Sequence, residues 1–229
     1  MNTNKTIIVG GGEIGKSLLS VLEKHYDCKI IDVEVDDNPE EYEIMHVCFP
    51  YSDKFVEYVK VYQNLYKPKY TVCHSSVPVG TSEKICAVSS PCMGIHPHLG
   101  ESFKTFIKFL GGKDADKIAD YFRRAGIKVY LTDKSDSTEY MKIMSTTFYG
   151  IMIEFTKQVK QDCRDKDIPF ELFTLWNMNY NDGYEKLGYP EYKKPLLTPI
   201  MKIQGGHCTL QNSYLIENDF TKLLRDRNK

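Results

Sequence analysis

The sequence predicts an α/β protein in which a doubly wound, mostly parallel sheet is followed by a small helical domain with one long helix. Over residues 1–133, short apolar runs alternate with segments of helical spacing, which is the order that builds a parallel sheet with helices on both faces. A glycine-rich turn joins the first apolar run to the first helical segment. After residue 133 the strand pattern stops, and apolar residues recur every three or four positions to about residue 165.

The first part contains six predicted strands and three predicted helices. Each strand is a short apolar run that ends at glycine, proline or charged residues. The last helix ends at Gly126, a residue suited to the left-handed conformation that closes many helices. The strands are Thr6–Val9, Cys28–Val33, Ile44–Phe49, Tyr70–Cys73, Met93–Ile95 and Ile127–Leu131, and the helices start near Ile14, near Phe55 and at Lys113.

The second part, residues 134–229, is predicted to be helical at its start and mostly loop from Asn179 onward. Ser135 or Asp136 caps the long helix, and a second helix covers Ile168 to Met178. The long helix is apolar on more than one face, so it needs partners on more than one side. We therefore expect residues 1–133 to bind a nucleotide, and residues 134–229 to hold the substrate and to form a homodimer.

Composition excludes several classes of protein. The 229 residues carry 30 Lys and Arg against 31 Asp and Glu, so the basic excess of a nucleic-acid-binding protein is absent. No apolar run approaches the ~18–20 residues that cross a bilayer, and the N-terminus lacks the plan of a signal peptide. The seven cysteines follow no disulfide or zinc spacing. These features indicate a cytoplasmic protein that binds neither nucleic acid nor a membrane.

The glycines at positions 10, 12 and 15 match the G-x-G-x-x-G pattern between a strand and a helix. Gly10 permits the tight turn, Gly12 lets a pyrophosphate approach the backbone, and Gly15 lets helix and strand pack closely. The phosphates would lie at Gly11, Glu13 and Ile14, against the helix N-terminus. Asp32, at the end of the second strand, is placed to bind ribose hydroxyls, and no Arg follows it to bind a 2′-phosphate. The setting predicts a Rossmann-type domain that binds NAD rather than NADP.

Two further motifs occur in the chain, at His74-Ser75-Ser76-Val77-Pro78-Val79-Gly80-Thr81 and at Gly205-Gly206-His207-Cys208. Together with the glycines they resemble the UDP-glucose/GDP-mannose dehydrogenase family, along most of the chain and in the same order. The chain is similar to a short, divergent member that lacks the family's third domain. His96-Pro97 is also similar to a motif of prephenate dehydrogenases, and the two-domain plan resembles the β-hydroxyacid dehydrogenases.

The resemblance implies an NAD-dependent oxidoreductase that transfers a hydride from an alcohol of a nucleotide sugar or hydroxy acid. It implies Cys208 as a nucleophile, Lys142 as a cation for the developing oxyanion and Ser76 as a polar contact. It places Pro50 and Ser75 beside the cofactor. The residues that it places near the substrate are His96, His98, Thr146, His207 and Asn212.

Two positions depart from the family. Thr146 stands where the family has Asn, and Asn212 stands where it has Asp. A second function therefore stays open, a nucleotide-binding protein that has lost catalysis and serves a regulatory role. His96, His98 and His207 could instead form a metal site. This hypothesis is weaker than a role in substrate binding because no acidic or cysteine partner follows at a fixed spacing, so we expect no metal. We expect the glycine turn, Ser75, Ser76, His96, Lys142 and Cys208 to meet at the carboxyl edge of the sheet.

Overall fold

The computed structural model describes residues 5–32, 40–94, 98–197 and 206–228. They form two compact units, Met1–Ile143 and Met144–Lys229, so the unit boundary falls within the long helix. The domain boundary that the sequence suggested, between residues 133 and 134, lies before this helix. Each unit is described by itself below.

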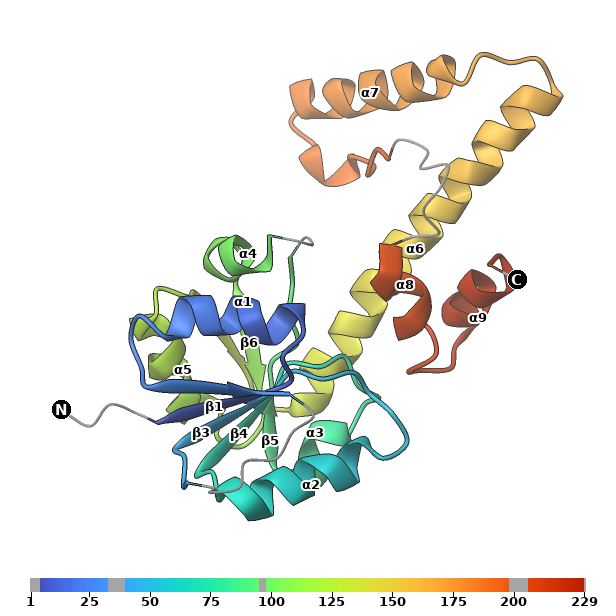
Figure 1. Cartoon of the computed structure of the whole chain (residues 1–229). Helices are drawn as coiled ribbons and strands as arrows, with labels where there is room; N and C mark the ends of the chain where they lie inside the picture. The colour runs from blue at the N-terminus through green and yellow to red at the C-terminus, as the bar shows by residue number, and fades with distance from the viewer. Residues whose placement is uncertain (1–4, 33–39, 95–97, 198–205, 229) are drawn as a thin grey trace. The chain divides into compact units, whose positions relative to one another are not determined.

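The first unit is a seven-stranded sheet in the order β2-β1-β3-β4-β5-β6-β7 (Figure 1). All neighbouring strands are parallel except β5 and β6, which pair antiparallel at Ser89 and Gly111. The mostly parallel, doubly wound sheet predicted from the sequence is confirmed. The strands are β1 Thr6–Val9, β2 Cys28–Ile31, β3 Ile44–Val47, β4 Tyr70–Cys73, β5 Ala87–Ser89, β6 Lys108–Gly111 and β7 Val129–Thr132.

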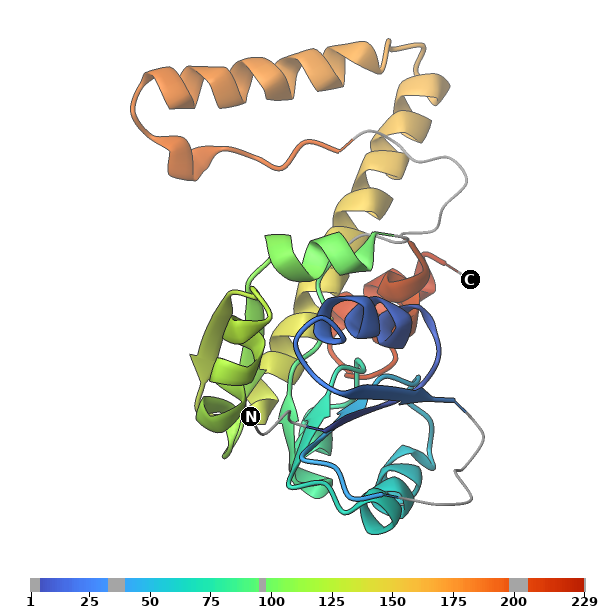
Figure 2. The same cartoon turned by 60° about the vertical axis from the view of Figure 1, so that its left-hand side comes forward.

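Helices cover both faces of this sheet (Figures 1 and 2). Alternate strand residues point to opposite faces, so Ile8, Ile44 and Val72 pack with α1, α4 and α5, whereas Ile7 and Met45 pack with α2. The helices are α1 Glu13–Leu22, α2 Phe55–Tyr66, α3 Thr81–Lys84, α4 Leu99–Thr105 and α5 Ala115–Arg124. Gly126 ends α5 with a φ of +77°, as predicted.

One predicted strand is wrong. Met93 and Gly94 are not in a strand, and Ile95 lies outside the described residues. Gly94 has a φ of +150°, and a Cβ there would lie 2.4 Å from the Ser102 side chain, so the backbone bends close to α4 at this point. The fifth strand is Ala87–Ser89 instead, and the sequence analysis also missed β6.

The second unit begins inside α6, Ser135–Asp165, whose bounds agree with the predicted long helix. The predicted second helix is present as α7. The prediction that the chain is mostly loop from Asn179 onward is wrong, because α7 continues to Lys186. Its aromatic residues pair four positions apart, with the rings of Tyr180 and Tyr184 4.7 Å from each other. The remaining elements are α7 Glu171–Lys186, the short 3₁₀ helix η1 Pro190–Tyr192, α8 Gly206–Asn212 and α9 Asp219–Asp226.

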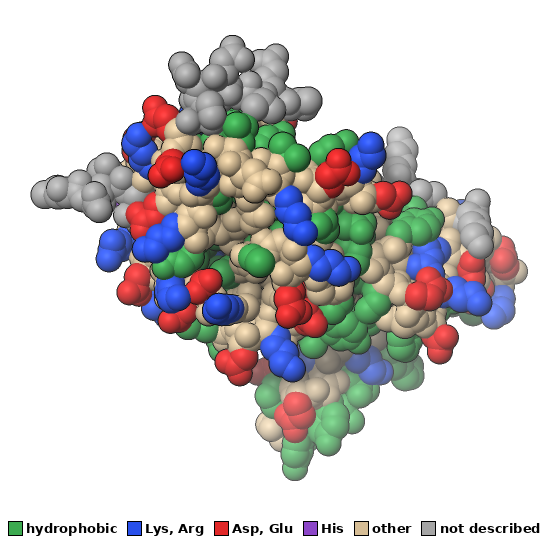
Figure 3. Space-filling view, turned by 90° about the horizontal axis from the view of Figure 1, so that it is seen from below, with side chains coloured by type: hydrophobic (Ala, Val, Ile, Leu, Met, Phe, Trp, Pro, Cys, Tyr) green, Lys and Arg blue, Asp and Glu red, His purple; other side chains and the backbone are tan. Residues whose placement is uncertain are grey.

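The surface shows no dominant charge on the face seen in Figure 3, where acidic and basic side chains are interspersed. Among the described residues, no helix is both long and apolar enough to span a bilayer. None of the seven cysteines, all of which lie in the described part of the chain, forms a disulfide.

Candidate cofactor and catalytic site

The glycine turn after β1 has the geometry that its spacing predicted. Gly10 has a φ of +112°, and a Cβ on it would lie 2.8 Å from the Cys48 carbonyl carbon. A Cβ on Gly15 would lie 1.9 Å from the Gly10 carbonyl oxygen, so only glycine lets α1 pack this closely on the turn. A Cβ on Gly12 would meet nothing within 4 Å. Two of the glycines are therefore required by the fold, and Gly12 leaves space.

Gly12 lies at the N-terminus of α1, where no side chain caps the helix. The amide groups of a first helical turn have no partners within the helix, and the helix dipole favours an anion there. The turn therefore offers an open, positively polarised surface. A pyrophosphate fits these residues, and a larger side chain at Gly12 would take its place.

Asp32 lies beside this turn, directly after β2. Its Oδ1 atom accepts a hydrogen bond of 3.2 Å from the backbone N–H of Gly11. The carboxylate is otherwise exposed, so it has acceptor capacity left for hydroxyl donors. The contact fixes the carboxylate next to the glycine turn, a position from which it could bind the ribose of a dinucleotide.

The loops after β3 and β4 lie at the same carboxyl edge of the sheet. Ser75 is buried, and its hydroxyl donates a bond of 2.5 Å to the carbonyl of Phe49, the residue before Pro50. Ser75 thus ties the two loops together. Pro50 is exposed and Ser76 is half-buried. The glycine turn, Ser75 and Ser76 thus follow parallel strands at one edge of the sheet, and their joint role at a cofactor stays a prediction.

Lys142 reaches this edge from the second turn of α6. Its Nζ atom donates to the Cys92 carbonyl at 2.7 Å, just beyond the end of β5. One turn earlier, the buried carboxylate of Glu139 accepts 2.7 Å bonds from the backbone N–H groups of Gly80 and Ser82. Charge-assisted bonds of this kind are stronger than neutral ones. Glu139 therefore anchors the start of α6 to the loop that follows Ser75 and Ser76.

A buried chain of polar side chains crosses the sheet beneath α5. His46 Nδ1 lies 2.8 Å from His74 Nε2, and His46 Nε2 lies 3.1 Å from the Tyr121 hydroxyl. Tyr121 also contacts the Thr6 hydroxyl at 3.1 Å, and His74 Nδ1 lies 3.1 Å from the Ser90 carbonyl oxygen. Burial and the nearby Lys108 ammonium lower the pKa of His46 to about 3, and they hold the pKa of His74 well below its usual value.

These contacts fix the proton positions along the chain. A carbonyl oxygen only accepts, so His74 Nδ1 carries the proton, and its neutral ring leaves Nε2 as an acceptor. His46 must then donate from Nδ1 and accept at Nε2 from the Tyr121 hydroxyl. The donors of Tyr121, His46 and His74 therefore all point along this hydrogen-bonded series toward the Ser90 carbonyl.

Lys108 binds the same carbonyl from β6. Its Nζ donates to the Ser90 oxygen at 3.2 Å and lies 5.2 Å and 5.4 Å from the ring centres of Phe103 and Phe122. Burial lowers the pKa of Lys108, and the Lys142 ammonium lowers it further, whereas Cys92 and Cys48 oppose the shift. The aromatic faces partly replace the water that this buried cation has lost.

The second unit brings together the two positions that depart from the family pattern. The Asn212 side-chain amide donates a 3.2 Å bond to the Thr146 hydroxyl, which joins α8 to α6. A Cβ on Gly150 would lie 2.8 Å from a terminal methyl group of Leu224 and 3.4 Å from Thr209, so a larger residue at this point of α6 would displace the Leu224 side chain. Cys208 lies one turn before Asn212 on α8 and is half-buried.

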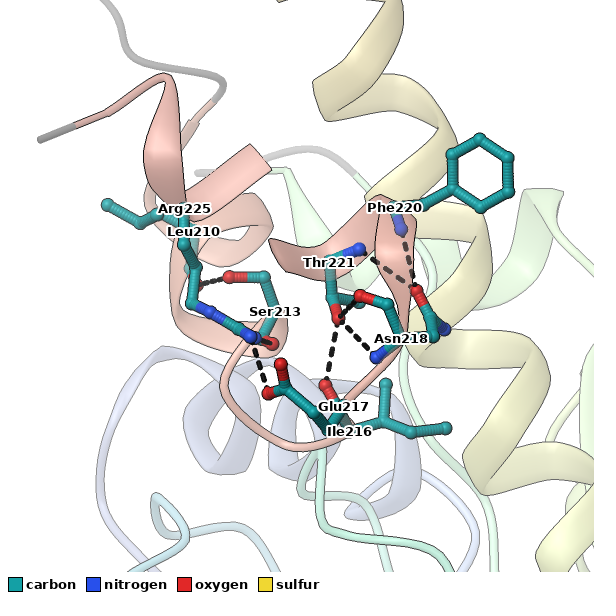
Figure 4. Close-up of polar contacts among 8 residues, drawn as sticks. All are labelled: Leu210, Ser213, Ile216, Glu217, Asn218, Phe220, Thr221 and Arg225. Atoms are coloured by element: carbon teal, nitrogen blue, oxygen red, sulfur yellow. Dashed lines mark hydrogen bonds and ion pairs between the residues drawn. The ribbon is translucent and has the colours of Figure 1, made fainter. Parts of the chain in front are cut away.

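The helix that carries Cys208 is fixed at its other end by α9 (Figure 4). Arg225 donates to the Ser213 carbonyl, directly after α8, and to the Glu217 carboxylate. Asn218 caps α9 by accepting bonds of 3.0 Å and 2.9 Å from the N–H groups of Phe220 and Thr221. The loop between α8 and α9 is thus held by its own side chains.

Comparison with known proteins was made at the levels of sequence and structure. Neither a protein-family model nor a curated protein sequence matches the chain. Among solved structures, UDP-D-ManNAc dehydrogenase from Pyrococcus horikoshii superposes with a TM-score of 0.72 at 15% identity, over 98% of this chain and 68% of that one. UDP-glucose dehydrogenase from Pyrobaculum islandicum gives 0.70 at 12% identity, over 99% and 68%.

The chain has the fold of the UDP-sugar dehydrogenases. Mycobacterium tuberculosis 3-hydroxyisobutyrate dehydrogenase also matches, with a TM-score of 0.64 at 9% identity, over 98% of this chain and 92% of that one. Resemblance to both groups was expected from the motifs. At these sequence identities the similarity establishes the fold alone.

The predicted site residues fall into three groups. The glycine turn, Asp32, Ser75 and Lys142 belong to the first unit, and the geometry above describes them. Thr146, Cys208 and Asn212 belong to the second unit, and their approach to the cofactor stays a prediction. His96 lies outside the described residues, as does the side chain of His207, while His98 is exposed at the start of α4.

The sequence analysis missed His46, Lys108 and Glu139. A signal existed for the first two, because each is a polar residue within a short apolar strand, where burial requires a specific partner. Glu139 gave no signal, since an acidic residue early in a helix is usually exposed.

Proposed function

We propose that the protein is an NAD-dependent oxidoreductase that oxidises an alcohol group of a small substrate. The observation that carries the proposal is the open space at Gly12, next to an Asp32 carboxylate held by the Gly11 N–H. Gly10 and Gly15 would be needed for backbone packing alone, but no atom of the described residues lies close enough to require glycine at position 12. A bound pyrophosphate explains it.

Bound NAD accepts the hydride that leaves the substrate carbon. Gly11, Gly12 and the first turn of α1 would hold the pyrophosphate, and Asp32 would hold the adenosine ribose. Lys142 would stabilise the negative charge that develops on the substrate oxygen. In a second oxidation, the Cys208 thiolate would add to the aldehyde product to form a thiohemiacetal, and a second NAD would accept its hydride. Water would hydrolyse the resulting thioester to the acid and release the Cys208 thiol.

The structural relatives suggest the substrate class. Two are named for UDP sugars and one for 3-hydroxyisobutyrate, so a nucleotide sugar or a hydroxy acid is the proposed substrate. A regulatory, nucleotide-binding protein without catalysis is the second candidate. The hydrogen bond between Asn212 and Thr146 favours it, because both side chains are neutral and engage one another. For both candidate functions we propose a location in the cytoplasm. The absence of disulfides among the seven cysteines is consistent with this reducing compartment.

Replacing Gly12 by valine tests cofactor binding directly. The position has open space and a φ of −71°, so we expect an unchanged fold and at least a tenfold loss of NADH affinity by calorimetry. Gly183→Val is the matched control, since a Cβ at Gly183 on α7 also meets nothing within 4 Å, and it should bind NADH normally.

Asp32→Ala gives a second measure of the same site. Loss of charge-assisted bonds to the ribose should weaken NAD binding about 10–100-fold and should weaken NADP binding much less. A wild-type protein that binds neither NADH nor NADPH at millimolar concentration would contradict the proposed function.

We also propose a homodimer built on α6 and α7. Along α7, all of which is described, no side chain is buried, and Trp176 is 76% exposed. On α6, Phe148 and Phe155 are 59% and 54% exposed. An apolar surface of this extent is typical of an interface, and a second copy of the same helices would cover it.

We expect a double Leu175→Asp and Trp176→Asp variant to sediment as a monomer of about half the wild-type mass, because charges on α7 would have to be buried in the dimer. The paired control, Glu171→Ala and Asp182→Ala, changes exposed acidic residues of the same helix and should remain a dimer. A wild-type protein that sediments as a ~26 kDa monomer at micromolar concentration would rule out the interface.

A further inference from the structure

The Ser90–Cys92 turn, which follows β5, is bound through its carbonyl groups. The Ser90 carbonyl accepts from His74 Nδ1 at 3.1 Å and from Lys108 Nζ at 3.2 Å, and the Cys92 carbonyl accepts from Lys142 Nζ at 2.7 Å. The Ser90 hydroxyl is buried and has no partner among the described residues. The Ser90 N–H also donates to the Cys73 carbonyl at 2.8 Å, so this backbone bond and the carbonyl bonds together fix where the turn lies.

The His74 bond has a single possible direction. His74 is neutral, its Nδ1–H points at the carbonyl, and its Nε2 accepts from His46 Nδ1. His46 is in turn held by Tyr121, so the imidazole of His74 is fixed at both ends. A ring held this way cannot turn toward another acceptor without leaving a buried group unpaired, which costs about 1–3 kcal/mol.

We propose that His74 is a positioning residue for Lys142. By holding the Ser90 carbonyl, His74 fixes the turn that presents the Cys92 carbonyl to the Lys142 ammonium. A lysine has a flexible stem with about 2 kcal/mol of rotamer entropy, so an acceptor in a fixed place selects one orientation of its head group. This inference rests on the proposed function, in which Lys142 acts on the substrate oxygen.

Two other roles for His74 do not fit the geometry. A proton relay would need a group that releases the proton after His74. The hydrogen-bonded series of side chains ends at the Ser90 carbonyl, and a carbonyl oxygen has no proton to pass on. Activation of Cys92 is also excluded. Its sulfur lies 4.0 Å from His74 Nδ1, which already carries a proton and so cannot take one from the thiol.

Two amide substitutions separate the two bonds of His74. In His74→Asn the amide nitrogen takes the place of Nδ1, so the bond to Ser90 is kept and the bond to His46 is lost. In His74→Gln the longer side chain reaches His46 and loses Ser90. Each variant loses one neutral hydrogen bond, so both should be destabilised by a similar amount. Only the Gln variant should lower kcat, by about 10–100-fold with little change in KM, because a misplacement of about 1 Å costs that much.

A second measurement does not depend on turnover. Reductive methylation of Lys142, followed by mass spectrometry on the protein without substrate, should be several-fold faster in His74→Gln than in wild type or His74→Asn. Exposed Lys134 provides the internal reference. If His74→Gln does not fold, Lys108→Met removes the other donor to the Ser90 carbonyl and should also speed labelling of Lys142.

The outcomes separate this inference from the proposed function. Equal kcat and equal Lys142 labelling in the Asn and Gln variants would overturn the positioning role. If Lys142→Met leaves turnover unchanged, the proposed role of Lys142 fails, while the labelling rates still decide whether His74 positions it.

Discussion

Replacing Lys142 by methionine is expected to lower kcat for substrate oxidation by about 10²–10⁴-fold, the usual contribution of a group that acts on the reacting proton or charge. The ammonium is held at the carboxyl edge of the sheet by the Cys92 carbonyl at 2.7 Å, next to loops that we propose to contact the cofactor. Methionine keeps the volume of the stem and removes the charge. NADH affinity should be unchanged, because the proposed cofactor contacts belong to the glycine turn and Asp32.

The assay is NADH production at 340 nm with UDP-glucose, UDP-N-acetylmannosamine and 3-hydroxyisobutyrate as a starting panel. Lys134→Met, a change at an exposed lysine just before α6, is the control and should retain full activity. Cys208→Ser distinguishes one oxidation from two. If the enzyme makes an acid, the serine variant should stop after the first hydride transfer, whereas an enzyme that transfers one hydride should be insensitive. Full turnover by Lys142→Met on an accepted substrate would disprove the role of this lysine.

The glycine turn was predictable because its reasons are local. Gly10 needs a positive φ, and Gly15 must pack against the Gly10 carbonyl only five residues away. The spacing of the three glycines is therefore enough to predict the shape of the turn. The alternation of strands and helices likewise follows from short apolar runs. The long helix was predictable because its apolar spacing continues without a proline or a glycine cluster from Ser135 to Asp165.

The buried polar residues were not predictable, because their partners are far apart in the sequence. His46, His74 and Tyr121 come from β3, the end of β4 and α5, and nothing local shows that the three would share one face. The antiparallel strand β6 was missed for a related reason. Its buried Lys108 breaks the apolar pattern, and the aromatic rings and the carbonyl that accommodate this cation become evident only in three dimensions.

The second large expected effect is a loss of stability in acid that originates at His46 and His74. Unfolded histidine has a pKa of about 6.5, whereas burial lowers the pKa of folded His46 to about 3 and that of His74 well below its usual value. Below pH 6.5 the unfolded chain therefore binds protons that the folded chain does not. Stability contributed by the pair is complete above pH 6.5 and falls as the pH decreases, by about 1.4 kcal/mol per pH unit for each histidine.

Protonation cannot be accommodated without breaking the chain of hydrogen bonds. The groups that face the two rings are the Tyr121 hydroxyl, the Lys108 ammonium and the Cys92 thiol. Within the described part of the chain, no carboxylate acts on either ring to stabilise an imidazolium. A proton on His46 Nε2 would oppose the donor of Tyr121, and a proton on His74 Nε2 would oppose the donor of His46. The loss at pH 4.5 should therefore be about 3 kcal/mol from His46, whose pKa is lowered to about 3, and His74 adds to it in the same direction.

Urea unfolding between pH 4.5 and pH 7.5 measures this effect as the slope of unfolding free energy against pH. His46→Gln cannot titrate, so its slope should be smaller than that of wild type by about one proton, or about 1.4 kcal/mol per pH unit, even though the variant is less stable at pH 7.5. His25→Gln, which changes an exposed histidine, should keep the wild-type slope. Because acidic residues elsewhere contribute equally to all three proteins, the difference between slopes isolates the buried histidine. Identical slopes for wild type and His46→Gln would show that His46 does not resist protonation in the folded protein.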